Sequence, residues 1–192
     1  MNLRAHGPRI NPVNTAAQQV GRLRARGLTE KTWFNALWFQ STWFLCVLGR
    51  DALLPITLGM IALHFLLVTS ARGELRRLAP VAAVGIGVDA LLSAAGIFDF
   101  GPVLLPLWLM ALWIAFATTL TRALAVFGRN PWLAAAIGSV GVPFNYLVGA
   151  KMGAVTLPMN PVVTALVLVS VWAVLLPVLY RIAGPTNQQT SP

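Results

Sequence analysis

Charged side chains are scarce in this sequence. Asp, Glu, Lys and Arg make up only 10% of its 192 residues, whereas 57% of the residues are hydrophobic. Soluble domains carry about 25% charged residues, because a surface that faces water needs them. The core of a bilayer is itself apolar, so a membrane protein has no such need in its spanning part. The composition therefore indicates an integral membrane protein.

The residues that build disulfides and metal sites are almost absent. Cys46 is the only cysteine, which excludes an internal disulfide and a cysteine-based zinc site. The two histidines, His6 and His64, form no HExxH pattern, and no Walker loop is present. Asp89 is the only acid inside a long apolar stretch, whereas intramembrane acid catalysis needs two carboxylates. We therefore expect no metal, no cofactor, no catalytic residue and no enzyme activity.

Long apolar stretches, by contrast, are frequent. A helix rises about 1.5 Å per residue, so about 20 apolar residues cross a bilayer core. The sequence has six stretches of about this length between residues 32 and 182: 33–48, 52–69, 78–97, 103–120, 131–150 and 161–180. They predict an all-α membrane protein, a bundle of six transmembrane helices.

The positive charges are distributed unequally between the segments that join these stretches. If the N-terminus is inside, twelve of the 14 Lys and Arg residues fall on the inner side, and only Arg50 and Lys151 fall outside. Inner loops of membrane proteins carry an excess of Lys and Arg. The pattern predicts a bacterial inner-membrane protein with both termini in the cytoplasm. Because these charges flank the apolar stretches, the net charge of +9 does not indicate a nucleic-acid partner.

The two ends of the chain differ from the apolar part. Residues 1–31 are polar and basic, and we expect a cytoplasmic segment whose charge fixes the orientation. A short basic helix lying on anionic lipid is the alternative for this segment. Residues 183–192 are rich in Pro, Thr, Gln and Ser and predict a disordered cytoplasmic tail.

Small residues recur at a spacing of four in two of the stretches. Membrane helices associate through small residues, because lipid gives apolar side chains no reason to leave it. We therefore expect the third and fifth helices to touch in the bundle interior. The residues concerned are Ala83, Gly87, Ala90 and Ala94 in the third stretch, and Gly141, Asn145, Gly149 and Gly153 in the fifth.

Asp89 is the first candidate for a functional residue. It lies about 16 Å from the inner end of its helix, near the middle of the bilayer. An ionisable group there is costly and indicates a ligand or proton site, although a neutral Asp bonded to a neighbouring helix is an equal alternative. If the third and fifth helices touch, Asn145 lies within reach of Asp89. The deep tryptophans Trp43 and Trp113 would complete a ligand site.

Two further groups of polar residues are weaker candidates. Gln40 and His64 would form a second polar layer nearer the cytoplasm, although a lone intramembrane His is more often a packed group than a proton relay. At the outer face, four charged residues either solvate the loops or form the rim of an outward-facing cavity: Arg50, Asp51, Asp99 and Lys151.

Several short phrases of the sequence occur together in one known order. They are Asn35, Phe39-Gln40, Trp43-Phe44 and Cys46-Val47-Leu48-Gly49, then Phe98-Asp99-Phe100-Gly101, Trp108, Leu112-Trp113, Phe116-Ala117, Pro143, Tyr146, Gly149-Ala150 and Gly153-Ala154. In this order they resemble a bacterial inner-membrane family known as domain of unknown function 2878, over about residues 33–181. Val142 stands where the family favours Gly. The resemblance implies a compact helical membrane protein and brings no known activity or site residues.

Two functions follow as hypotheses. In the first, the protein binds or transports a small, partly apolar molecule through a site around Asp89. In the second, it is a non-catalytic accessory or structural subunit that packs against another membrane protein or a lipid-modifying enzyme. A polar, water-reachable cavity at Asp89 would favour the first, and a dry, fully packed Asp89 the second.

Overall fold

The computed structural model describes residue 21, residue 27 and residues 31–184. Most of the basic segment 1–31 and of the tail 183–192 lies outside the described residues, so the predictions for these segments stay predictions. The described chain forms α2 (Thr32–Gly49), η2 (Arg50–Leu53), α3 (Leu54–Leu67), α4 (Ala71–Ala94), α5 (Leu107–Leu120), η3 (Phe127–Arg129), α6 (Pro131–Lys151) and α7 (Pro161–Ala183). No strand occurs in this part of the chain.

Four stretches are long and apolar enough to cross a membrane: Thr32–Leu67, which contains α2, η2 and α3, and the helices α4, α6 and α7. Helix α5 is apolar but has only 14 residues. The all-helical class is therefore confirmed, and the long apolar helices indicate a membrane protein. The number of crossings and their direction remain predictions.

Helix boundaries differ from the apolar stretches where capping or proline decides them. Helix α4 begins seven residues before the predicted stretch 78–97, because the Ser70 side chain accepts a hydrogen bond from the Gly73 N–H and caps it. Helix α5 begins after Pro106 rather than at residue 103, since proline disfavours helical geometry in the residue before it.

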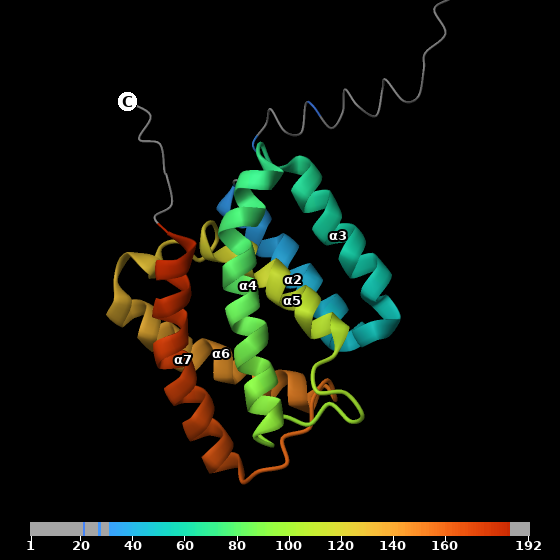
Figure 1. Ribbon diagram of the computed structural model, residues 1–192, viewed down its shortest axis with the longest axis vertical. Helices are drawn as coiled ribbons and strands as arrows, with labels where there is room; N and C mark the ends of the chain where they lie inside the picture. The colour runs from blue at the N-terminus through green and yellow to red at the C-terminus, as the bar shows by residue number, and fades with distance from the viewer. Residues whose placement is uncertain (1–20, 22–26, 28–30, 185–192) are drawn as a thin grey trace, which may run out of the picture.

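The helices form two groups joined by α4 (Figure 1). Helices α2, α3 and α5 pack on one another, and α6 packs along α7 in the most extensive helix contact of the structure. Helix α4 packs against both α5 and α7. This arrangement places α4, which carries Asp89 in its last third, between the two groups.

The expected contact between the small residues of the third and fifth helices is not what the structure shows. Ala83, Gly87 and Ala94 of α4 are exposed, and the closest approaches occur at two other glycines. A Cβ on Gly85 would lie 2.1 Å from the Trp113 ring of α5, and one on Gly138 would lie 2.4 Å from the Trp172 carbonyl of α7. The closely packed face of each helix is thus rotated from the predicted one.

Candidate functional site

Asp89 is completely buried and joins three helices. Its Oδ2 accepts a hydrogen bond of 2.7 Å from the Trp113 indole N–H on α5. The Tyr146 hydroxyl on α6 lies 2.7 Å from both Asp89 oxygens. No basic side chain of the described residues forms an ion pair with Asp89. Neutral donors alone therefore hold this carboxyl group in place.

The Trp113 ring is fixed on both sides. Gly85 of α4 leaves the space that the ring occupies, since any side chain at this position would overlap it. Trp172 of α7 stacks on Trp113 with a centroid distance of 5.6 Å and an interplanar angle of 5°. The Trp113 ring can therefore lie here only because residue 85 is glycine. In this position its indole N–H reaches Asp89.

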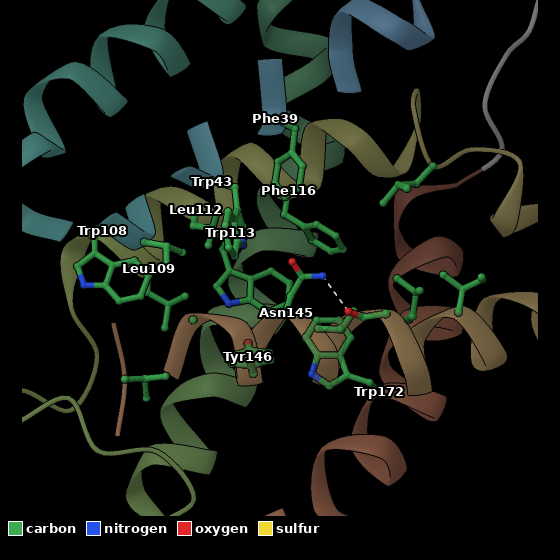
Figure 2. A pocket seen from close by; sticks show the side chains of 18 of the residues that line it. Phe39, Trp43, Trp108, Leu109, Leu112, Trp113, Phe116, Asn145, Tyr146 and Trp172 are labelled. Carbon is green, nitrogen blue, oxygen red and sulfur yellow. Dashed lines mark hydrogen bonds between the residues drawn. The ribbon is translucent and has the colours of Figure 1, made fainter. Parts of the chain in front are cut away.

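A cavity of about 270 Å³ lies beside this group and is lined by residues of α2, α5, α6 and α7 (Figure 2). Its lining extends from Leu124, after α5, to Phe100 and Val155, in the loops at the other end of the bundle. Eight of the 19 lining residues are aromatic: Phe39, Trp43, Phe100, Trp108, Trp113, Phe116, Tyr146 and Trp172. No charged side chain of the described residues lines it.

The small residues of α6 make room for this cavity. Gly141, Asn145 and Gly149 all line it, and a Cβ added at either glycine would meet no atom within 4 Å. The small residues whose spacing of four predicted a helix–helix contact therefore line the cavity instead. The Asn145 amide nitrogen donates to the Gly141 carbonyl at 2.8 Å, since that carbonyl can only accept. The amide oxygen has no partner among the described residues, and Figure 2 shows the amide directed toward the Trp113 and Phe116 rings.

The residues predicted to surround Asp89 lie in two places: some contact Asp89 and others form the cavity wall. Asn145 does not reach Asp89, and its neighbour Tyr146 makes that contact instead. Trp43 and Trp113 both line the cavity, as does Trp172, whose buried Nε1 has no hydrogen-bond partner in the described chain. Tyr146 was missed in the sequence, although a tyrosine beside Asn145 is a plausible donor for a buried acid.

His64 and Gln40 do not form a polar layer. Gln40 is exposed, whereas His64 is buried and its Nε2 lies 3.1 Å from Glu74 of α4. The Arg122 guanidinium, after α5, donates to both Glu74 oxygens. In the sequence, Glu74 lies among Arg72, Arg76 and Arg77 in a segment expected to be a loop, and it was not identified as a candidate. This cluster ties α3, α4 and the end of α5 together and does not line the cavity.

The four outer-face candidates do not rim the cavity. Asp51 accepts a hydrogen bond of 3.3 Å from the Trp108 N–H at the start of α5, and Asp99 accepts one of 2.8 Å from the Gly101 N–H. The Asp99 backbone also pairs with Thr156 in an isolated antiparallel bridge. Arg50 and Lys151 are exposed. The two acids thus order the loops at this end of the bundle.

The described residues contain no group of three or more His, Cys, Asp or Glu side chains that could hold a metal ion. Over residues 32–178 the chain matches the family described as "Protein of unknown function (DUF2878)". The chain belongs to this family. No curated protein and no solved structure matches it. The DUF2878 match covers Asp89, Trp113, Tyr146 and the whole cavity wall, and it confirms the resemblance seen in the sequence.

Proposed function

We propose that this DUF2878 protein binds a small, partly apolar molecule in the cavity between α2, α5, α6 and α7, as a binding or transport protein and not as an enzyme. The cavity of about 270 Å³ is the observation that carries this proposal. Ligand sites are mostly apolar, largely preformed cavities of about 300–1,000 Å³ with a few converging polar groups. This cavity lies just below that range, which suits a compact ligand.

In this proposal the ligand contacts the cavity wall and not Asp89 itself. Asp89 is completely buried behind Trp113 and Tyr146 and acts as a positioning residue for both rings. The unpaired Asn145 oxygen lies in the wall and supplies a direct hydrogen-bond acceptor. Asn145, Trp43 and Trp113 of the predicted site are therefore proposed as ligand contacts, whereas His64 and Gln40 are not.

The proposed topology has six crossings in a bacterial inner membrane, one for each helix from α2 to α7. Arg50 has a φ of 48° at the end of α2, and η2 follows, which supports a reversal of the chain between α2 and α3. Six crossings place both termini on one side, and the Lys and Arg distribution makes that side the cytoplasm. Helix α5 is about 21 Å long and would need its flanking residues to complete a crossing.

An accessory subunit without a ligand is the second candidate, and the complete burial of Asp89 favours it. A purely structural acid would be enclosed by donors in the same way. This reading leaves the aromatic cavity and the unpaired Asn145 oxygen without a role.

The two candidates differ in whether the protein retains a small molecule. Wild-type protein and the Gly141→Leu variant would be purified in the same mild detergent, extracted with organic solvent and compared by mass spectrometry. Leucine at 141 would fill the cavity without meeting an existing side chain at its Cβ. We expect a compound that wild type retains and the variant lacks. Identical small-molecule contents would contradict the proposal and support an accessory subunit.

A further inference from the structure

We infer that the ligand of this cavity is a lipophilic organic cation, a compact quaternary or protonated amine with an apolar substituent. The inference rests on the proposed function and specifies its ligand class. Three features of the site carry it: the aromatic walls, the carboxyl group behind them and the acceptor in the wall.

The aromatic walls offer a cation an attractive surface. The faces of aromatic rings carry negative potential, and a cation within about 6 Å of a ring centroid is attracted to them, most strongly by tryptophan. Trp43, Trp108 and Trp172 line this cavity together with phenylalanine and tyrosine rings, whereas both faces of the Trp113 ring are covered, by Gly85 and by Trp172. Aromatic cages recognise quaternary ammonium groups in other proteins.

Asp89 strengthens this preference from behind the wall. It accepts hydrogen bonds from Trp113 and Tyr146, and both of these rings line the cavity. Accepting an N–H or O–H bond polarises the donor, and hydrogen bonds in a region of low dielectric polarise each other. An ionised carboxylate one ring away from the cavity also acts over this distance directly, because the protein between them screens it less than water would.

No positive group of the described chain opposes an ionised Asp89 at the cavity. Arg122 is paired with Glu74 and does not line the cavity, and Arg50 and Lys151 are exposed. The Asn145 oxygen adds a further negative end of a dipole to the wall. An anion would be repelled by an ionised Asp89, and a neutral hydrocarbon would leave the Asn145 oxygen unused.

Two probes of nearly identical shape distinguish the contribution of positive charge to binding from that of apolar fit. Benzyltrimethylammonium and neopentylbenzene differ at one atom, a positively charged nitrogen in place of a carbon. Both would be titrated against the full chain in detergent micelles, with tryptophan fluorescence as the readout, since four tryptophans line the cavity. The Gly141→Leu variant corrects for probe that partitions into the micelle.

We expect wild type to bind the cation at least about tenfold more tightly than the neutral probe. Asp89→Asn should remove most of this difference, because the amide keeps the shape of the group and loses its charge. The wild-type comparison needs no variant, so it holds even if Asp89→Asn fails to fold.

The unfavourable outcomes are distinguishable. If wild type binds neopentylbenzene as tightly as the cation or more tightly, the inference of a cationic ligand is overturned and the proposed function stands. If neither probe changes the fluorescence of wild type beyond that of Gly141→Leu, the proposed function fails as well.

Discussion

Asp89 lies in the last third of α4, and all its described hydrogen bonds come from neutral donors on two other helices. A buried carboxyl group of this kind is either charged and stabilised by those donors or neutral. Because hydrogen bonds to a charged acceptor contribute about 1.5–3 kcal/mol and neutral ones about 0.5–1.5 kcal/mol, the strength of its bonds reports its charge.

The two tyrosines of the chain provide a matched test. The Tyr146 hydroxyl donates to Asp89, whereas the Tyr180 hydroxyl donates to the Leu124 carbonyl at 2.7 Å, a neutral acceptor. We expect Tyr146→Phe to lower the free energy of unfolding by about 1.5–3 kcal/mol and Tyr180→Phe by about 0.5–1.5 kcal/mol. Unfolding by sodium dodecyl sulfate in mixed micelles would measure both. Equal losses would indicate a neutral Asp89.

The sequence revealed Asp89 as a candidate but not its partners. An acid isolated in an apolar stretch can be recognised from the sequence alone. Whether Asn145 or Tyr146 reaches it depends on the rotation of α6 by one residue, about 100°, which is set by packing on α7. Glu74 was missed because its partners, His64 of α3 and Arg122 after α5, meet it only in the folded chain.

At the scale of helices, small residues spaced four apart occur in two settings, a helix–helix contact and a cavity wall. Gly138 lies against the Trp172 carbonyl in the α6–α7 contact, whereas Gly141 and Gly149 face the cavity. The sequence pattern of these glycines is similar, and only the position of the neighbouring helix distinguishes them. This is why the all-helical class was predictable and the residues through which the third and fifth helices touch were not.

Alanine substitutions on α6 separate the two kinds of glycine. At Gly138 an added Cβ would lie 2.4 Å from backbone oxygen, which cannot move without separating α6 from α7. We expect Gly138→Ala to destabilise the protein by about 1–3 kcal/mol. Gly141→Ala, three residues away, should be neutral or slightly stabilising, since alanine is the better helix former. The same detergent unfolding assay measures both, and equal effects would contradict the described α6–α7 packing.

At the scale of the whole molecule, the account rests on an open cavity in the protein. Cys46 is the only native cysteine and has no exposed area, so the wild-type chain offers a background without a reactive thiol. Val140 of α6 is 71% exposed on a surface that we assign to lipid, and Asn145 lines the cavity. Thiols react with small thiosulfonate reagents as thiolates, which need water to form.

The most direct measurement is therefore the reaction of Asn145→Cys with a small, neutral, water-soluble methanethiosulfonate in reconstituted membranes, followed by mass spectrometry of the intact chain. We predict one modification of Asn145→Cys, and none of wild type or of Val140→Cys within the same time. If Asn145→Cys is as unreactive as Cys46, the small-residue face of α6 does not line an open cavity, and the ligand-binding account is contradicted.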